Sequence, residues 1–167
     1  MLFWAFARCN FSAKIPVVIS YMGGTTMPVD VHVYTDHLSE QIAGQLLKIY
    51  VDMPEHEKPG EILQSIAAGL CGGDRYYAGY FNGRYICGVL IHDEGEFRSM
   101  RYLAVHPATR GRGVAERLVD EVRLKETERT HGLLVTAFDT SDPELVSIFL
   151  AMGFLPHKDG QFRCTLR

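Results

Sequence analysis

Three strand-like segments joined by two tight turns constrain the fold more than any other feature of this sequence. Residues 76–81 and 84–92 flank the pair Asn82-Gly83, which is typical of a two-residue hairpin turn. A second turn at residues 93–95 leads into a longer segment over residues 96–105. Consecutive strands joined by such short turns run antiparallel. The sequence therefore predicts an antiparallel meander over residues 76–105.

Hydrophobic spacing places further elements on both sides of this meander. An alternating segment at residues 31–35 predicts a strand, and two helices should follow it, one capped by Ser39 and one begun by Pro59. After the meander we expect, in order, helix 114–128, strand 133–138, helix 142–152 and strands 154–156 and 161–166. The order β-α-α-β-β-β-α-β-α-β-β predicts one α/β domain with a mixed sheet and about four helices.

The charge balance and the cysteines exclude several classes of protein. Lys and Arg number 17 and Asp and Glu number 20, a formal net charge of −3. Such a chain is a poor candidate for a general nucleic-acid or anionic-membrane binder. The four cysteines form no CxxC pair, which excludes a zinc ribbon or thioredoxin-like motif and predicts no metal site: Cys9, Cys71, Cys87 and Cys164. Reduced thiols are typical of the cytoplasm, where we expect the protein.

Residues 1–26 differ from the rest of the chain and carry only two charged residues, Arg8 and Lys14. Three interpretations stay open: a secretory signal with an interrupted apolar run, a segment with an extra strand at residues 17–21, or an extension upstream of a true start at Met27. The apolar run is too short and too interrupted to span a bilayer. We therefore expect the domain to comprise residues 27–167.

A glycine-rich turn between the strand ending at Val105 and the helix starting near Val114 is the segment most informative about chemistry. The first N–H groups of a helix lack intrahelical partners and carry the positive end of the helix dipole. Gly111 and Gly113 have no Cβ, so a phosphate can approach the main chain, and nearby arginines add charge. The turn predicts a diphosphate site. Plain turn glycines and an RNA-contacting segment are the alternatives, whereas a Walker loop and a dinucleotide fingerprint lack their patterns.

The turn, with the residues before it, resembles the R-x-x-G-x-G/A signature of the GCN5-related N-acetyltransferases (GNAT). Arg110, Gly113 and Ala115 occupy the signature positions, after a Val-His-Pro lead-in at residues 105–107, and a late helix ends in Gly153-Phe154. The resemblance covers residues 30–166. It implies a single GNAT domain whose meander is followed by a splayed parallel pair of strands.

The resemblance also implies acetyl-CoA as the ligand and assigns residues to it. The pyrophosphate would lie on the N–H groups of the turn and the helix start, which are Arg110, Gly111, Arg112, Gly113, Val114 and Ala115. The pantetheine arm would run between the splayed strands and pair with the main chain of one of them, at Leu103, Ala104 and Val105. Phe149 would pack on the thioester.

The catalytic residues are unknown from sequence. A family Tyr that often protonates the leaving thiolate is replaced here by Phe149, so Tyr102 and Ser147 are substitutes and Glu96 a candidate base. Tyr102 and His106 should share a strand face with Met100 and Ala104, which favours ordinary sheet positions for them. The connector after the first helix holds carboxylates that would suit a cationic amine or lie in a solvated loop: Asp52, Glu55 and Glu57.

Two functions follow from the resemblance. One is an N-acetyltransferase that passes the acetyl group directly to a small amine or peptide acceptor. The other is a non-catalytic acetyl-CoA sensor, similar to the maturation factors of aspartate 1-decarboxylase, that binds a protein partner when acetyl-CoA is bound. Residues 48–52, 77–84 and 109–114 carry this second likeness.

Overall fold

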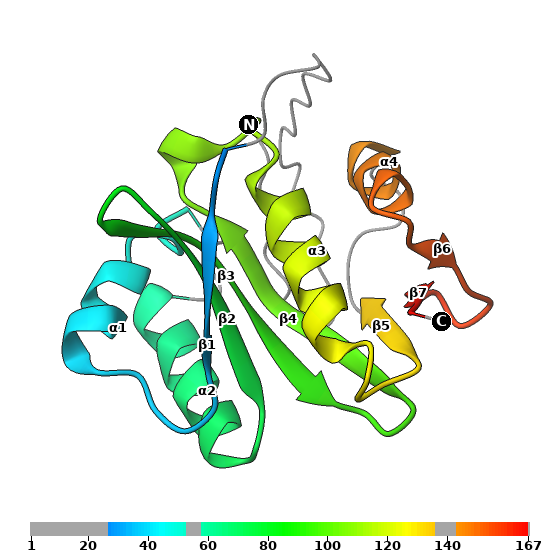
Figure 1. The fold of residues 1–167 in the computed structure, drawn as a ribbon, viewed down its shortest axis with the longest axis horizontal. Coiled ribbons are helices and arrows are strands. Elements are labelled where there is room, and N and C mark those ends of the chain that lie inside the picture. The colour runs from blue at the N-terminus through cyan, green and yellow to red at the C-terminus, as the bar shows by residue number, and fades with distance from the viewer. Residues whose placement is uncertain (1–26, 53–57, 136–142, 167) are drawn as a thin grey trace.

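The computed structural model describes residues 27–52, 58–135 and 143–166 and places seven strands in one sheet (Figure 1). The strand order is β1-β2-β3-β4-β5-β7-β6. All neighbouring strands are antiparallel except β4 and β5, which are parallel. The element order predicted from the sequence is confirmed, with one 3₁₀ turn added after β4.

The predicted meander forms the centre of the sheet. It comprises β2 (Arg75–Phe81), β3 (Arg84–Asp93) and β4 (Phe97–Val105), and β1 (Asp30–Tyr34) pairs with the outer edge of β2. Asn82 and Gly83 both have positive φ, 47° and 81°, which matches the primed turn that a two-residue hairpin needs. Glycine-containing turns thus set the direction of three consecutive strands.

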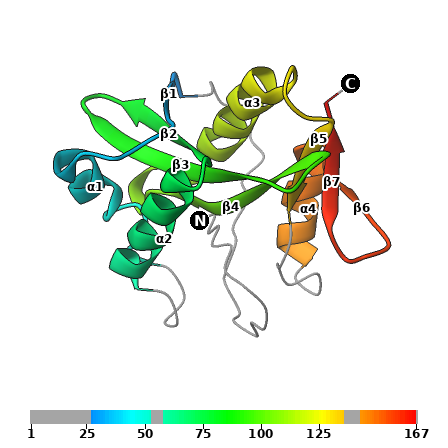
Figure 2. The same cartoon turned by 90° about the horizontal axis from the view of Figure 1, so that it is seen from below.

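Helices cover both faces of the sheet (Figure 2). α1 (Glu40–Leu46) and α2 (Pro59–Cys71) pack on one face, and α3 (Val114–Glu126) packs on the other with α4 (Pro143–Ala151) in the same apolar cluster. Ser39 caps α1 as predicted, because its hydroxyl accepts from Ile42 N–H at 3.4 Å. α1 is shorter than predicted. From Lys48 onward, N–H groups bond three residues back rather than four, which tightens the chain into turns.

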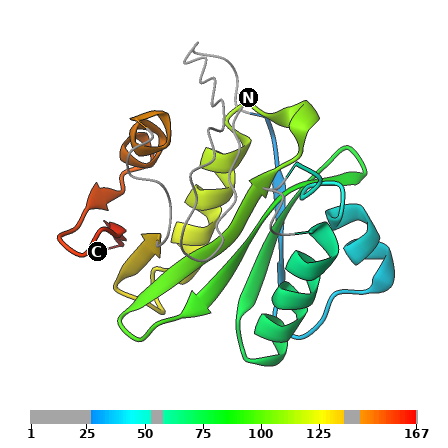
Figure 3. The same cartoon turned by 180° about the vertical axis from the view of Figure 1, so that it is seen from behind.

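The strands beyond β4 are short. β5 (Gly132–Val135) pairs with β7 (Phe162–Thr165), which pairs with β6 (Leu155–Pro156). β5 pairs with β4 only where residues 97–99 face residues 132–134. The predicted splay of this parallel pair is therefore confirmed: the second half of β4 continues without β5 beside it (Figure 3).

A β-bulge interrupts β4 and corrects one prediction. Gly88 pairs with Ala104 and Leu90 with Arg101, so one β3 residue faces two β4 residues. Tyr102, at the bulge, has a φ of +53°. The extra residue reverses the side of the sheet on which alternate side chains lie. Met100 therefore packs in the apolar cluster between the sheet and α3 (the α3 cluster), whereas Ala104 packs in the cluster between the sheet, α1 and α2 (the α1–α2 cluster). The predicted shared face is therefore wrong for Met100, whereas Tyr102 and Ala104 pack on the same side.

Several predictions fall outside the described residues. These are the domain boundary after residue 26, the possible strand at 17–21, Glu55 and Glu57 of the connector, and the end of strand 133–138. Among the described helices, none is both long enough and apolar enough to cross a membrane.

Candidate ligand-binding site at the splayed strands

The free edge of β4 is the first part of the site. His106 N–H donates to Ile86 O on β3 at 2.7 Å. Because main-chain polar groups alternate along a strand, those of Val105 and Leu103 point to the opposite edge, toward the β5 side. The side chains of both residues are buried in the core. What this edge offers a ligand is therefore main-chain hydrogen-bonding groups of Leu103 and Val105, whereas those of Ala104 point toward β3; the pairing with a ligand stays a prediction.

Two buried tyrosines hold the bulge, and sequence analysis missed this arrangement. The Tyr50 hydroxyl donates to Tyr102 O at 2.9 Å, and the Tyr76 hydroxyl lies 2.9 Å from the Tyr50 hydroxyl. Since Tyr50 uses its proton on the carbonyl, Tyr76 must donate to Tyr50. Burial raises the pKa of both hydroxyls, so both stay protonated. The left-handed conformation of Tyr102 is thus held by a chain of two hydrogen bonds, from the Tyr76 hydroxyl to the Tyr50 hydroxyl and from there to the Tyr102 carbonyl.

The glycine-rich turn is the second part of the site. Gly111 and Gly113 have φ values of +70° and +69°, a conformation that glycine adopts without a Cβ clash. Gly113 is the N-cap of α3. A shallow hollow is lined by this turn, by the first residues of α3 up to Glu116, and by Val105 and Thr109 before the turn. Within the described part of the chain, the main-chain N–H groups of residues 111–116 donate no hydrogen bond. Those of residues 111–115 are among the donors predicted for a diphosphate, whereas the Arg110 N–H, also predicted, donates to Pro107 O at 3.5 Å.

The two arginines of the turn have different surroundings. Arg110 is buried, with its side chain 3% exposed: Nε donates to Val105 O at 3.0 Å and Nη2 lies 3.0 Å from Asp52 Oδ2. Burial lowers the pKa of this guanidinium, and Asp52 opposes that shift. Arg112 is exposed. Arg110 therefore ties the turn to β4 and to the segment after α1, and one carboxylate of the predicted acidic rim is engaged by it.

The remaining predicted residues are not all close together. Phe149 is fully buried, with ring centroids 5.7 Å from Phe154 and 6.0 Å from Phe162. Ser147 is exposed on α4. Glu96 is exposed and precedes β4 at the end opposite the turn, about 30 Å along the strand from Val105. Tyr102 lies beside the free edge. Catalytic roles for Glu96, Tyr102 and Ser147 stay predictions.

No cluster of three or more His, Cys, Asp or Glu side chains suited to a metal ion occurs in the described ranges. The site consists instead of main-chain donors from a strand edge and a helix start. Such a site fits a long ligand that has amides to pair with a strand and an anionic group to lie at the helix.

Comparison with known proteins identifies one family. The family of the PanZ acetyltransferase (GNAT) domain matches residues 29–163. That match runs from β1 into β7 and includes the free edge and the turn. No match is found among the curated proteins.

Solved structures share the fold at low sequence identity. The GNAT family acetyltransferase from Elizabethkingia anophelis with acetyl-CoA bound is 15% identical, with a TM-score of 0.62 over 82% of this chain and 97% of that one. Tetrahymena GCN5 is 15% identical, with a TM-score of 0.63 over 83% and 96%. The Escherichia coli protein YhhK, bound to coenzyme A, is 21% identical, with a TM-score of 0.60 over 83% and 99%. These likenesses show that the chain has their fold.

Proposed function

Because the chain belongs to the PanZ family of acetyltransferase (GNAT) domains, we propose that it binds acetyl-CoA at the splayed strands and uses that binding to control a protein partner. One observation supports the choice of ligand. β5 no longer pairs with β4 after Ser99, and the unpaired part of β4 lies next to a turn whose N–H groups, at residues 111–116, donate no hydrogen bond within the described chain. A strand edge and a helix start are thus offered side by side.

Each part of acetyl-CoA has a matching group on this chain. The diphosphate would accept from the N–H groups that open α3, where the helix dipole favours negative charge. The amides of the pantetheine arm would pair with the main chain of Leu103 and Val105. The side chains of these residues are buried in the apolar core, which lowers the local dielectric and strengthens such hydrogen bonds.

The regulatory role is supported by the family match and by Phe149. A phenyl ring cannot donate a proton to a leaving thiolate, and this ring is fully buried among other phenylalanines. By the likeness to the maturation factors of aspartate decarboxylase, bound acetyl-CoA would favour the conformation that the partner recognises. The ligand shifts that equilibrium only by its difference in affinity for the two conformations.

Acetyl transfer to an amine is the second candidate, and the free β4 edge favours it. The amine nitrogen would attack the thioester carbonyl carbon and the carbon–sulfur bond would break. The amide and the CoA thiolate would form, and the proton lost by the amine would pass to water or to the thiolate. A main-chain N–H of β4 could stabilise the oxyanion that develops on the carbonyl. A thiol with a pKa of about 8.5 leaves without an obligatory acid.

Gly111→Ala tests the diphosphate site, with Gly95→Ala as its matched control. Both glycines have positive φ, +70° and +87°, and a Cβ would meet no atom within 4 Å at either position. Each substitution should therefore destabilise folding similarly, by about 1 kcal/mol. Calorimetry should show an affinity for acetyl-CoA about tenfold lower for Gly111→Ala alone. Equal affinities of the two variants would contradict the placement of the diphosphate.

Arg110→Ala and Asp52→Asn together separate two roles of Arg110. If Arg110 positions the turn through its contact with Asp52, both variants should weaken acetyl-CoA binding several-fold. If Arg110 instead binds the diphosphate, Asp52→Asn frees its guanidinium and should leave the affinity equal or higher. We expect the first result, because Arg110 also donates to Val105 O.

Two assays on the unmodified protein decide between the candidate functions. Release of CoA from acetyl-CoA is measured with a panel of amino acids, polyamines and peptides. Co-elution with aspartate decarboxylase is measured with and without acetyl-CoA. Co-elution that requires acetyl-CoA, with no amine-dependent release, supports the regulatory role. Amine-dependent release without co-elution supports acetyl transfer and refutes the regulatory role.

A further inference from the structure

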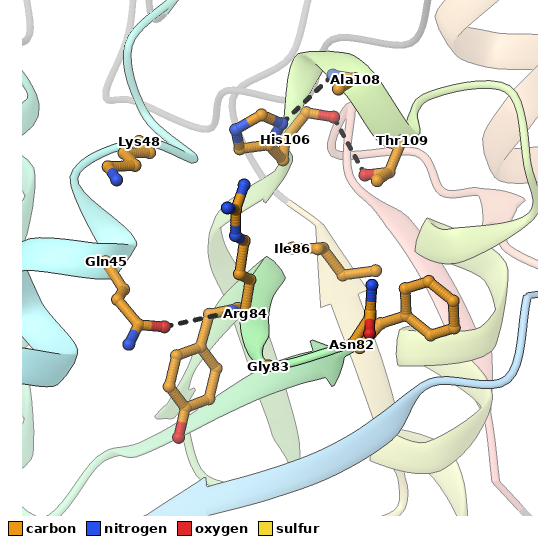
Figure 4. Close-up of a pocket in the computed structure, with 11 residues that line it drawn as sticks. Gln45, Lys48, Asn82, Gly83, Arg84, Ile86, His106, Ala108 and Thr109 are labelled. Atoms are coloured by element: carbon orange, nitrogen blue, oxygen red, sulfur yellow. Dashed lines mark hydrogen bonds between the residues drawn. The ribbon is translucent and has the colours of Figure 1, made fainter.

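A second, larger cavity lies beside the glycine-rich turn. It has a volume of about 590 Å³ and is bordered by the end of α1, the β2–β3 hairpin and the 3₁₀ turn at Pro107–Thr109 (Figure 4). Thr109 lines both this cavity and the hollow over the turn. The volume lies within the range of pockets that hold small organic ligands.

The cavity lining is basic. Lys48 enters from the turn after α1 and Arg84 from the start of β3, and none of the described residues that line the cavity is acidic. In Figure 4 the Arg84 guanidinium points toward His106. Neither Lys48 nor Arg84 forms an ion pair with any residue of the described ranges. Two positive charges thus border one cavity without a counter-charge among the lining residues that the structure describes.

His106 adds a third donor. Ala108 N–H donates to His106 Nδ1 at 3.2 Å. An amide can only donate, so the neutral ring carries its proton on Nε2. Burial lowers the pKa of His106, as do Arg110, Arg84 and Lys48, whereas Asp52 raises it. The imidazole therefore stays neutral near pH 7 and keeps an Nε2–H.

Part of the lining is apolar. Ile86 is 5% exposed, and Phe81 is half-buried in the α3 cluster. Tyr85 is also buried, and its N–H donates to Gln45 Oε1 at 3.4 Å. The cavity thus combines cationic donors with carbon surface, which suits an anion that carries a hydrocarbon body better than a bare inorganic ion.

We propose that this cavity binds a small organic acid, with its carboxylate held by Lys48 and Arg84 and its carbon body against Phe81 and Ile86. This site differs from the turn, because its donors are side chains rather than main-chain N–H groups. Binding there requires neither acetyl-CoA nor a partner, so the inference stands apart from the proposed function and its test does not depend on it.

Titration of the isotope-labelled, full-length protein with hexanoate, followed by amide NMR shifts, tests this site. We expect saturable shifts at residues 82–84 and at His106, Ala108 and Thr109, with a dissociation constant of roughly 1 mM, weaker at high salt. Hexanamide, the uncharged analogue, should cause none. Inorganic phosphate should bind at least fivefold more weakly than hexanoate. Equal binding of hexanamide or of phosphate would overturn the assignment.

Matched charge variants test the residues named. Arg84→Gln and Lys48→Gln should each weaken hexanoate binding about fivefold to tenfold. Lys125→Gln removes the same charge from an exposed position on α3 and should change nothing. A bound carboxylate should also raise the pKa of His106, because it opposes the neighbouring cations. Unchanged binding in both cavity variants would refute the proposal.

The cavity could instead bind the 3′-phosphate of coenzyme A, which is the other anion to be tested. The affinities of CoA and 3′-dephospho-CoA are therefore compared in the unmodified protein and in Arg84→Gln. We expect Arg84→Gln to affect both coenzymes equally. If it weakens only CoA, the cavity belongs to the coenzyme and the organic-acid site is refuted.

Discussion

Replacing Tyr50 by Phe tests whether the hydroxyl chain holds the β4 bulge. Tyr50 and Tyr76 are both fully buried, and the Tyr50 hydroxyl links Tyr76 to the carbonyl of Tyr102. Tyr50→Phe keeps the ring and removes the hydroxyl. The Tyr76 hydroxyl then has no acceptor in this chain of hydrogen bonds, and the Tyr102 carbonyl loses its donor.

The expected loss of stability follows from these two groups. A buried donor or acceptor left unpaired costs about 1–3 kcal/mol, and a carbonyl that water can reach costs less. Tyr102 is half-buried, so its carbonyl is the smaller contribution. We therefore expect Tyr50→Phe to lower the free energy of unfolding by about 2–3 kcal/mol.

Urea denaturation of three variants provides the measurement. Tyr76→Phe leaves the Tyr50–Tyr102 bond in place and should cost only about 1 kcal/mol. The double variant no longer buries an unpaired Tyr76 hydroxyl, so it should be more stable than Tyr50→Phe. Tyr80→Phe is the control, because the half-buried Tyr80 stacks on His32 and its hydroxyl makes no hydrogen bond in the described chain. A double variant less stable than Tyr50→Phe would refute the reasoning.

Two further predictions concern buried groups away from the site. Glu126 is fully buried and pairs with Arg75 at 2.7 Å, so Glu126→Gln should destabilise the fold by about 3 kcal/mol in urea denaturation. Glu121→Gln removes a half-buried carboxylate on the same helix whose partner Arg117 is exposed, and it should cost less than about 0.5 kcal/mol; equal losses would contradict the role of burial. Burial raises the pKa of the Cys87 thiol to about 12, so at pH 8 it stays protonated and should resist iodoacetamide until urea is added. The exposed Cys71 should react in the native state, and peptide mass spectrometry distinguishes the two.

Local signals in the sequence were sufficient for the elements and for the turn. The Asn82-Gly83 pair and the glycines Gly111 and Gly113 act through a left-handed backbone conformation that few residue types favour. Ser39 acts through its hydroxyl, which accepts from an N–H three residues later. Such signals depend on neighbours only a few residues away. For that reason the element order and the position of the unpaired helix start could be predicted without any long-range contact.

The bulge and the role of Arg110 could not be predicted in the same way. Tyr102 has a left-handed conformation that its residue type does not indicate. It is held by the hydroxyls of Tyr50, in the turn after α1, and Tyr76, in β2. Arg110 has the expected position in the turn, but its guanidinium is bound to Asp52, 58 positions earlier in the chain. Both depend on contacts that exist only after the sheet has formed.

The short segment after α1 connects these contacts. Lys48 lines the basic cavity, Tyr50 donates to the bulge and Asp52 binds Arg110 of the turn, so alternate residues of one segment reach three parts of the site. Arg110 in turn bonds Val105 O at the free edge. A ligand that displaces Arg110 therefore acts on the segment that carries Lys48. Coupling between two binding sites is reciprocal, so any factor by which acetyl-CoA changes the affinity for an anion at Lys48 must equal the factor by which that anion changes the affinity for acetyl-CoA.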